Sequence, residues 1–514
     1  MSDQRKRTVL GIELGSTRIK AVTIDERHQP VSSGDCTWAS RYENGVWTYG
    51  LEEVWSGLRT ALAGIEDRES IAAMGVSAMM HGYLAFDRDW NLLTPFRTWQ
   101  NTITGQAAAE LTARFGFNIP QRWSIAHLYQ AMLNGEEHVP RVAHITTLAG
   151  YVHYMLTGVN ALGVGDASGM FPIDSETCDY DAAMLEKFNA LAAARGLSWT
   201  LEDVLPRVLV AGEDAGKLTE SGSAMLGGLL APGIPFAPAE GDAGTGMTAT
   251  NAVAPRTGNV SAGTSIFSMV VLEKPLSKVY PEIDMVTTPT GRPVAMVHCN
   301  NCTSDINAWA EALHGFAKAA GLSLGKGDVY TTLFESAMLG QKDCGGLIDV
   351  GYLSGEPVTG LEEGRPMMVR MPGTALSFAN LARSLVYGAI VTLKIGMDIL
   401  ADEHVRMDAL LGHGGFFKTP GTAQQLLAGA LNVPVSVMAT AGEGGPWGMA
   451  LLAAYRVRRE PGETLEAYLK NKVFADASGI TLDPDPADHE GFEAYTRRFT
   501  QALEAERAAV SHLK

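Results

Sequence analysis

The stretch Glu240-Gly241-Asp242-Ala243-Gly244-Thr245-Gly246, near the middle of the chain, contains the side chain best placed for chemistry. It sets one carboxylate between glycines, after an apolar, proline-rich approach. Glycines on either side can adopt φ > 0 and let a ligand come close to the backbone. A carboxylate in such a place can take a proton from a substrate hydroxyl. A tight turn without chemistry explains the same residues, because Asp and Gly both favour turns, so the flanking sequence must decide.

Two short hairpins, one in each half of the chain, have similar tips. The predicted hairpin over residues 8–24 turns at Gly15-Ser16-Thr17, and the one over residues 257–272 turns at Gly263-Thr264-Ser265. Apolar positions on both sides also align, which indicates a weak internal repeat. Chance is the competing explanation, because apolar hairpins with glycine tips are common. A repeat at the start of each half predicts two related domains, with Asp242 just before the second.

Two further glycine-rich turns follow in the second half. Gly412-His413-Gly414-Gly415-Phe416 comes after a predicted strand at Met407–Leu411, and Ala441–Gly448 precedes a predicted helix at Met449–Tyr455. Such turns let backbone N–H groups or a flat ring approach closely. Phosphoryl transfer needs a phosphate cradle, a metal ligand, a positioned hydroxyl and a base. The four turns and the central acid would supply these parts.

Length and composition set the frame for these motifs. A chain of 514 residues is too long for one hydrophobic core and predicts two large domains. Strand-length apolar runs alternate with helical patterns at Glu52–Leu62, Gln106–Phe115, Ile145–Leu156 and Asn380–Leu400, which predicts α/β layers. A net charge of −17 argues against a nucleic-acid or anionic-membrane surface. It leaves ATP open, because backbone amides and a metal ion can bind a polyanion.

The cysteines and the N-terminus point to the cytoplasm. Five cysteines fit a reducing compartment better than a disulfide framework. Cys299-Asn300-Asn301-Cys302 has redox-motif spacing but no second pair for a zinc site, so buried thiols are the simpler interpretation. Residues 1–7 are polar and charged, which is not a signal peptide. No window is expected to reach the roughly 18 apolar residues of a membrane helix.

Taken together and in order, these motifs resemble those of the FGGY carbohydrate kinases. The resemblance runs from about residue 8 to about residue 456. It covers two phosphate motifs at residues 11–17 and 263–265, an adenosine motif at residues 411–415 and the turn at residues 443–450. Met80-His81-Gly82 is similar to the sugar-contacting turn of xylulose kinases, and Trp99-Gln100-Asn101 to an element near the sugar. Each motif is weak alone, whereas their order and spacing are specific.

The resemblance implies an α/β fold of two actin-like (ribonuclease H-like) domains, each a mixed sheet flanked by helices, with an interdomain cleft. Residues 1–252 would form the N-terminal domain, with the sugar site and the first phosphate motif. Residues 253–514 would form the C-terminal domain, with the second phosphate motif and the adenosine motif. The implied reaction is ATP-dependent phosphorylation of a ketose, foremost xylulose, at its terminal hydroxyl.

The resemblance also implies roles for single residues. Asp242 would be the general base, and Glu13 would help to hold Mg²⁺ where the family usually has Asp. The sugar would contact Met80, His81, Gly82, Trp99, Asn101 and Asp242. ATP would contact Gly15, Ser16, Thr17, Lys20, Gly263, Thr264, Ser265, Gly412, Gly414, Gly415 and Phe416.

Several alternatives stay open beside this interpretation. A ribulose, hexulose, polyol or gluconate kinase has the same motifs, and Glu13 is compatible with a catalytically impaired relative. An actin-like ATPase without a sugar is a different class on the same fold, because fold does not fix function. His81 could be an ordinary buried histidine, and Lys20 a merely exposed lysine. The expected partners are a sugar and ATP, with neither nucleic acid nor membrane, and a homodimer is left open.

Overall fold

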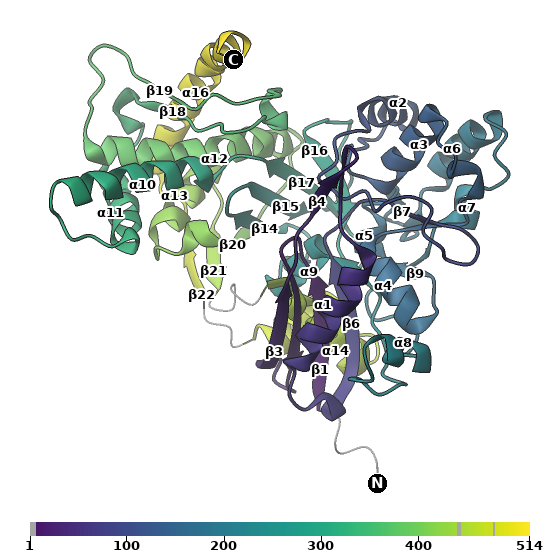
Figure 1. The fold of residues 1–514 in the computed structure, drawn as a ribbon. Helices are drawn as coiled ribbons and strands as arrows, with labels where there is room; N and C mark the ends of the chain where they lie inside the picture. Colours follow the sequence, from purple (N-terminus) through teal and green to yellow (C-terminus); the bar gives the residue numbers. More distant parts are fainter. Residues whose placement is uncertain (1–6, 439–443, 476–478, 514) are drawn as a thin grey trace. The chain divides into compact units, whose positions relative to one another are not determined.

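The computed structural model describes residues 7–438, 444–475 and 479–513, and the chain divides into two compact units (Figure 1). Unit 1 comprises Met1–Ala254, Met285–Val294 and Glu443–Asp476. Unit 2 comprises Pro255–Asp284, Ala295–Gly442 and Ala477–Lys514. This division differs from the predicted domains in two segments, because residues 285–294 and 443–476 return to unit 1.

The main sheet of unit 1 has five strands in the order β13-β6-β1-β2-β3. Strand β1 lies in its middle, antiparallel to β2 and parallel to β6, and β13 is parallel to β6 on the outer side. Most side chains of β1 are buried, so this apolar strand is the centre of the unit's core. The strands are β1 (Thr8–Leu14), β2 (Arg18–Ile24), β3 (Pro30–Thr37), β6 (Ile71–Ala78) and β13 (Glu240–Gly241).

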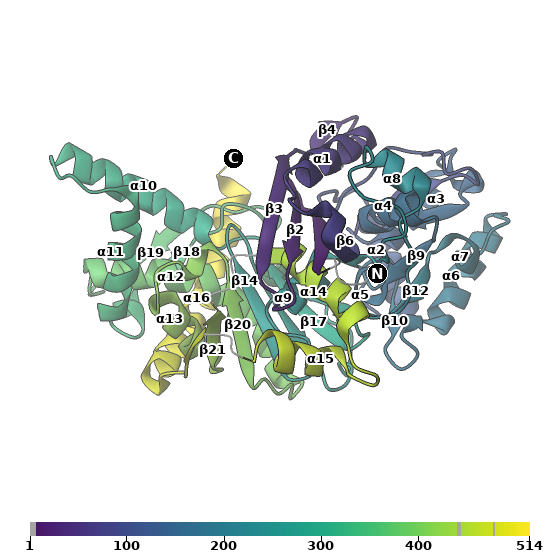
Figure 2. The ribbon, with the colours of Figure 1, turned by 90° about the horizontal axis from the view of Figure 1, so that it is seen from below.

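Helices α1 (Leu51–Ala63) and α14 (Gly444–Arg458) cover the two faces of this sheet (Figure 2). On the α14 side, a Cβ at Gly11 of β1 would lie 2.0 Å from the Pro446 carbonyl oxygen. Only glycine allows this close approach. Trp447 of α14 is buried and its indole N–H donates to the His28 carbonyl, which agrees with the prediction that it belongs to the core.

Unit 1 confirms the hairpin over residues 8–24 and corrects one predicted helix. Residues 145–156 are not one helix: β8 (His144–Thr146) ends there and α4 (Leu148–Thr157) begins. The Thr147 hydroxyl accepts a hydrogen bond from the Gly150 N–H and caps α4, so the chain turns where the apolar pattern alone predicts continuity. The other elements are α2 (Gly105–Phe115), α3 (Ser124–Asn134), α5 (Val164–Ala167), α6 (Ala182–Ala194), α7 (Leu201–Val204), α8 (Glu220–Met225), α9 (Asp242–Ala249), α15 (Leu465–Tyr468), β4 (Arg41–Glu43), β5 (Val46–Thr48), β7 (Leu84–Phe86), β9 (Ala161–Gly163), β10 (Ile173–Asp174), β11 (Asp179–Tyr180) and β12 (Arg207–Leu209).

The sheet of unit 2 has the order β16-β17-β15-β14-β20-β21-β22. Strand β14 pairs antiparallel with β15 across the second predicted hairpin and parallel with β20 on its other side. The strands are β14 (Thr257–Ala262), β15 (Ile266–Val271), β16 (Ile283–Thr287), β17 (Pro293–Cys299), β20 (Ala409–His413), β21 (Val435–Met438) and β22 (Gly479–Leu482), with a separate pair β18 (Ile348–Val350) and β19 (Met367–Val369).

Helix α12 (Phe378–Asp402) is the long apolar helix of unit 2. Contrary to the sequence expectation, it is long and apolar enough by composition to cross a membrane. In the described residues 78% of its most apolar window is buried, which is typical of a core helix. Its neighbours are α10 (Thr303–Ala319), α11 (Lys326–Leu339), α13 (Thr422–Leu431) and α16 (Pro486–His512).

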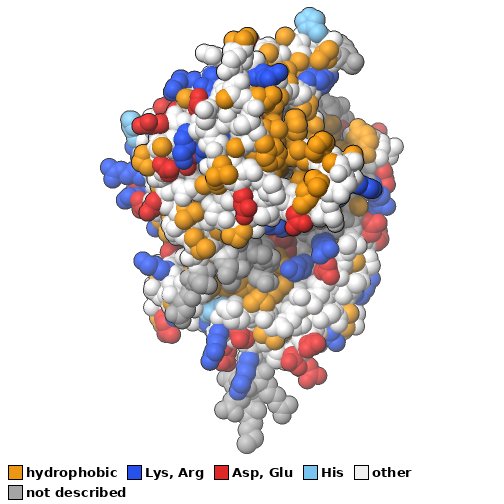
Figure 3. All heavy atoms as spheres, turned by 90° about the vertical axis from the view of Figure 1, so that its left-hand side faces the viewer, with side chains coloured by type: hydrophobic (Ala, Val, Ile, Leu, Met, Phe, Trp, Pro, Cys, Tyr) orange, Lys and Arg blue, Asp and Glu red, His pale blue; other side chains and the backbone are white. Residues whose placement is uncertain are grey.

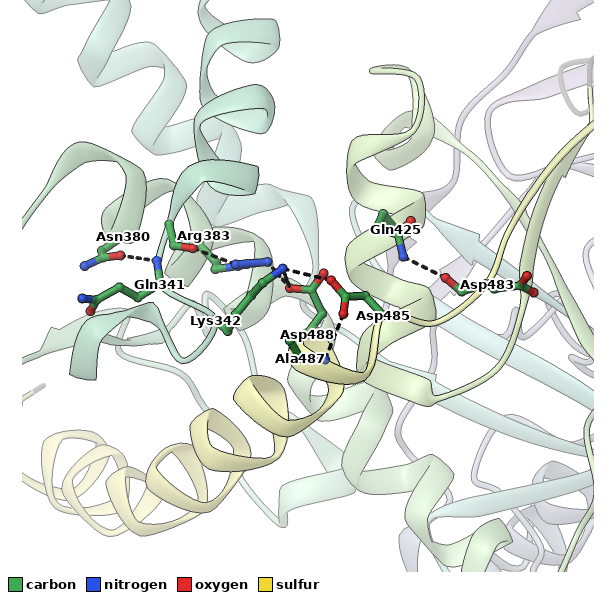
Figure 4. A network of polar contacts seen from close by, with 10 residues as sticks. Gln341, Lys342, Asn380, Arg383, Gln425, Asp483, Asp485, Ala487 and Asp488 are labelled. Atoms are coloured by element: carbon green, nitrogen blue, oxygen red, sulfur yellow. Dashed lines mark hydrogen bonds and ion pairs between the residues drawn. The ribbon is translucent and has the colours of Figure 1, made fainter.

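A buried ion pair fixes α16 to α12 (Figure 4). Arg383 of α12 and Asp488 of α16 are joined at side-chain exposures of 0% and 1%. Lys342 donates to both Asp488 (2.7 Å) and Asp485 (3.2 Å) at the start of α16. The C-terminal helix is therefore anchored at its first turn, where its negative side chains also favour the helix dipole.

The outer surface of unit 2 contains exposed apolar side chains among charged ones. Figure 3 shows the face that lies at the left of Figure 1, with orange apolar patches between lysines, arginines and acidic residues. Leu339 at the end of α11 is 82% exposed, and Phe316 of α10 is 70% exposed.

Candidate active site

Three parallel strands of unit 1 end at the same edge of the sheet. Ala78, the last residue of β6, is in register with Leu14 of β1 and with Gly241 of β13. The segments that follow these strands therefore start side by side: the Gly15 tip, residues 79–82, and Asp242. The Met79 N–H also donates to the Leu14 carbonyl (2.9 Å), which links the first two segments.

Asp242 is the first residue of α9, and its Oδ1 accepts a hydrogen bond from the Met80 N–H (3.1 Å). Solvent reaches the side chain, although protein surrounds it closely. This enclosure raises the pKa of Asp242, while the N–H groups of Met80 and Ala243 act in the opposite direction. A helix N-terminus favours a carboxylate, so Asp242 is held as an accessible and oriented acceptor.

The expectation that glycines around Asp242 use φ > 0 is wrong. Gly241 is extended at φ −80°, and Gly244 lies within α9. A Cβ at Gly241 would lie 2.9 Å from Cγ of Met80 and 3.0 Å from Oδ1 of Asp166. The glycine is needed for space, because the backbone passes close to side chains of other segments.

Two buried carboxyl groups behind Asp242 were not singled out from the sequence. Glu240 Oε2 accepts a hydrogen bond from the Asp166 N–H (3.0 Å), and Asp166 Oδ2 accepts one from the Thr147 hydroxyl (2.6 Å). Cβ atoms at Gly163 and Gly165 would lie 2.3 and 2.4 Å from the Glu240 carboxyl oxygens. Glycines thus make room for Glu240, and no local sequence pattern indicates this, because the contacts join distant segments.

Glu13 lies near the end of β1, opposite Lys20 of β2. Burial raises its pKa to about 8, the negative charge of Asp242 adds to this rise, and Lys20 opposes it. The Glu13 side chain extends over Gly445 of α14, where a Cβ would stand 1.4 Å from Oε2. The longer acid at this position therefore occupies space that a glycine leaves free.

The first tip has its carbonyl groups bound from behind. The Trp38 indole N–H donates to the Gly15 carbonyl (2.7 Å), the Tyr49 hydroxyl to the Ser16 carbonyl (2.7 Å), and the Trp38 N–H to the Thr17 carbonyl (3.1 Å). Within the described residues, no hydrogen bond uses the N–H of Ser16 or Thr17. The tip thus presents donors, which suits an anion.

The predicted sugar turn is compact and mostly buried. His81 has φ 71°, is 5% exposed, and its Nδ1 lies 3.2 Å from the Gly169 carbonyl oxygen. Gly82 has φ 90°, and a Cβ there would lie 2.8 Å from the Arg97 carbonyl oxygen. Met80 is 5% exposed, and its backbone N–H is the group that binds Asp242. The turn is therefore a rigid support for Asp242 in this structure.

Trp99 and Asn101 differ in exposure. Trp99 is 38% exposed, whereas Asn101 is 2% exposed. The Asn101 amide accepts from the Trp47 N–H (2.8 Å) and donates to the carbonyls of Trp47 and Thr98 (2.9 and 3.0 Å). Its side chain is thus already committed to the backbone, and its sugar contact stays a prediction.

Unit 2 brings its second tip and its adenosine turn to one sheet edge. Strands β14 and β20 are parallel, with Ser261 in register with His413. Gly414 has φ 103°, and a Cβ there would lie 2.3 Å from the Ala262 carbonyl oxygen, directly before the tip Gly263-Thr264-Ser265. Gly415 has open space around it, so its backbone is accessible.

Two residues of the adenosine turn face the core. Phe416 is 1% exposed and packs edge-to-face on Phe334 with ring centroids 5.7 Å apart. A Cβ at Gly412 would lie 2.7 Å from the Phe417 ring. The buried rings of Phe416 and Phe417 thus support the turn from the core side. Gly414 and Gly415 are exposed and form its accessible part. Residue 443 of the following motif lies outside the described residues.

Comparison with known proteins identifies the fold family. Residues 8–248 match the N-terminal domain of the FGGY family of carbohydrate kinases, and residues 258–457 match its C-terminal domain. The chain belongs to this family. It is a carbohydrate kinase, a phosphotransferase with the two-domain actin-like α/β fold.

Relatives of this FGGY kinase include xylulose kinases. The chain is 22% identical to the xylulose kinase of Staphylococcus epidermidis over 512 residues, 95% of each protein. With some other curated relatives the match spans about half of their length: it covers 46% of the xylulose kinase of Staphylococcus xylosus and 43% of this chain, at 20% identity.

Solved structures agree on the fold. A ligand-bound xylulose kinase from Lactobacillus acidophilus has a TM-score of 0.78 at 18% identity, covering 98% of this chain and 99% of that one. A gluconate kinase from the same organism has a TM-score of 0.78 at 17% identity, covering 97% and 98%. At these identities the likeness shows how the FGGY kinase folds, and the substrate needs its own argument.

Proposed function

We propose that this FGGY kinase transfers the γ-phosphoryl group of ATP to the terminal hydroxyl of a ketopentose, xylulose. The observation that carries the proposal is the placement of Asp242 at the sheet edge of unit 1, beside the first phosphate tip and residues 79–82. The names of its relatives favour xylulose over other sugars. Gluconate is the rival that a structural neighbour suggests.

In this proposal, Asp242 accepts the proton of the sugar hydroxyl as that oxygen attacks the phosphorus atom. A raised pKa makes a carboxylate a stronger base. The Met80 N–H keeps one carboxylate oxygen in place. The remaining lone pairs are left for the substrate hydroxyl, which must lie within hydrogen-bond reach.

The donors of the two tips would bind the β- and γ-phosphates. Within the described residues, no hydrogen bond uses the backbone N–H groups of Ser16 and Thr17 in unit 1 or of Thr264 and Ser265 in unit 2. Oriented dipoles of this kind stabilise the negative charge that spreads over the transferred group. Gly414 and Gly415 would line the nucleoside side.

Mg²⁺ would fit beside Glu13. Among the described residues, no group of three or more acidic, histidine or cysteine side chains can hold a metal ion by itself. Mg²⁺ is usually bound by one or two carboxylates, waters and substrate phosphates. Burial and, after it, the negative charge of Asp242 raise the pKa of Glu13, and a nearby cation would oppose that rise. When bound, the cation would neutralise phosphate charge.

The cellular location and the assembly of the enzyme are also proposals. We place it in the cytoplasm, acting on small molecules and independent of nucleic acid and membrane, as its charge and cysteines suggest. A homodimer is the assembly to test in solution.

A substrate panel tests the proposed function. ADP formation from ATP and Mg²⁺ is measured with xylulose, ribulose, hexuloses, polyols and gluconate, and without sugar. We expect turnover that depends on sugar and has the highest kcat/KM with xylulose. Equal ADP formation without sugar would instead indicate an ATPase. A clear preference for gluconate or a polyol would show that xylulose is not the substrate.

A further inference from the structure

The second tip is held from behind by the start of helix α10. The Cys302 N–H donates to the Thr264 carbonyl (3.0 Å). The Thr303 N–H and hydroxyl both donate to the Gly263 carbonyl (3.0 and 2.8 Å). The tip carbonyls are thus occupied from one side, and the position of residues 302 and 303 sets the position of the tip.

Asn301, one residue earlier, is fixed by the segment at residues 352–361. Its Oδ1 accepts from the N–H groups of Leu353 (3.0 Å) and Ser354 (3.1 Å). Its Nδ2 donates to the Ser354 carbonyl (3.2 Å). Asn301 is 7% exposed, so these bonds form away from competing water. One amide side chain thereby ties two loops that are far apart in sequence.

Glu356 completes the attachment from the same segment. It is 0% exposed, and its Oε2 accepts from both the N–H (3.2 Å) and the Nδ2 (3.1 Å) of Asn301. Its Oε1 has no hydrogen-bond partner within the described residues. Burial raises the pKa of Glu356 to about 7, although Asn301 and the backbone N–H groups of Asn300 and Val358 oppose this rise. A fully buried carboxyl group is costly, so its position calls for an explanation beyond packing.

The segment that carries Glu356 is itself stiff. The Glu356 N–H donates to the Leu361 carbonyl (2.7 Å), and the Leu361 N–H donates back to the Glu356 carbonyl (3.1 Å). A Cβ at Gly355 would lie 2.3 Å from the Glu362 carbonyl oxygen, so the backbone is closely packed there. This rigid segment therefore restrains Asn301, and through residues 302 and 303 it restrains the position of the tip.

We propose that Asn301 and Glu356 are positioning residues for nucleotide: they hold the second tip in the conformation that binds the phosphates of ATP. Neither side chain needs to touch the reacting atoms, because the effect passes through residues 302 and 303. The inference rests on the proposed function, in which this tip binds phosphate. The residues proposed for sugar binding belong to unit 1, so nucleotide and sugar parameters should respond differently.

The test compares Asn301→Ala and Glu356→Ala with two conservative changes. Glu356→Ala removes both hydrogen bonds between the two residues, whereas Asn301→Ala removes the side-chain one and the bonds of the Asn301 amide to residues 353 and 354. For both variants we expect KM for ATP to rise by about tenfold or more, since a lost buried hydrogen bond leaves its partner unsatisfied. KM for the sugar should stay within about twofold, because uniform loss of nucleotide binding leaves sugar binding intact. Glu356→Gln keeps an acceptor oxygen and should stay near wild type. Glu362→Gln, at an exposed position directly after this segment, is the matched control.

A second readout separates this inference from the proposed function. The dissociation constant of ADP, measured by titration without sugar, should rise in the alanine variants even if the sugar assignment fails. Should Glu356→Ala not fold, Asn301→Ser removes the side-chain hydrogen bond to Glu356 with a smaller change. Folded variants with unchanged KM for ATP and unchanged ADP affinity would overturn the inference, as would an equal rise in both KM values. A wild-type enzyme that binds ADP but phosphorylates no sugar would overturn only the proposed function.

Discussion

Two opposing influences act on the Asp242 carboxylate. Its surroundings raise the pKa, and the N–H groups of Met80 and Ala243 lower it. The balance yields a carboxylate that is oriented by the backbone and more basic than a free aspartate. Glu240 and Asp166 lie behind it, and burial raises both of their pKa values. At the residue scale, the site is therefore a set of acids whose charges influence one another.

Gly445→Ala tests whether Glu13 needs the space beside it. A Cβ would stand 1.4 Å from Glu13 Oε2, so the carboxylate must move. A misplacement of about 1 Å at a reacting site can cost about 10²-fold in rate, so we expect about a tenfold or larger loss of kcat/KM. In a Glu13→Asp background the loss should be smaller, because the shorter side chain withdraws from Gly445. Steady-state kinetics of the wild type, the two single variants and the double variant gives the coupling.

The matched control is Gly315→Ala in α10, where a Cβ meets nothing within 4 Å. It should leave kcat/KM unchanged. If Gly445→Ala costs the same in the wild-type and the Glu13→Asp backgrounds, contact with the carboxylate is not the cause.

Asp166 predicts a pH dependence of stability. Burial raises its pKa from 3.8 to about 7; the Thr147 hydroxyl opposes this rise, and the charge of Asp242 adds to it. The folded state therefore binds this proton more tightly than the unfolded state. Its contribution to the free energy of unfolding is complete below the unfolded pKa and is lost as the pH rises through about 7.

Asp166→Asn should flatten that dependence. The urea midpoint of the wild type, measured without ligands, should fall from about pH 4 to about pH 7, and that of the variant should fall less. Asp89→Asn, at an exposed position, should behave as the wild type. An unchanged slope in Asp166→Asn would contradict the assignment of a shifted pKa to this residue.

At the element scale, the sequence predicted the elements that have a clear apolar pattern. The strands that become β1 and β20 are short apolar runs, and the helices that become α1, α2 and α12 follow helical apolar patterns; each forms near its predicted bounds. The break at Thr147 was missed because one cap overrides a continuous apolar pattern. Strand β13 is only Glu240–Gly241, too short for a periodic signal, so the register that places Asp242 beside β6 could not be predicted.

The anchor of α16 carries an element-scale prediction. Asp488→Ala leaves the Arg383 guanidinium buried without its partner. Breaking a buried ion pair in this way costs about 3–5 kcal/mol, so the thermal midpoint of unfolding should fall clearly. Glu504→Ala removes an exposed pair with Arg507 on the same helix, and surface pairs contribute about 0–1 kcal/mol. An equal fall of the thermal midpoint in both variants would show that the buried ion pair contributes no more to stability than the exposed one.

At the scale of the whole molecule, each unit contributes one tip whose carbonyls are bound from behind. Aromatic side chains do this in unit 1, and the start of α10 does it in unit 2. The internal repeat and the family were readable from the sequence, because both rest on local motifs. The supports were not: Asn301, Glu356 and Glu240 act through partners dozens of residues away. The return of residues 443–476 to unit 1 was missed for the same reason.

Asp242→Asn with xylulose and ATP is the most direct test of the central claim that Asp242 is the general base. The change removes the basic carboxylate but keeps an oxygen that can accept the Met80 N–H, so the fold and ADP affinity should persist. Sugar-dependent ADP formation should fall by about 10²–10⁴-fold, the usual contribution of such a base. Turnover within about threefold of wild type would contradict the claim, because general-base catalysis cannot be lost at so small a cost.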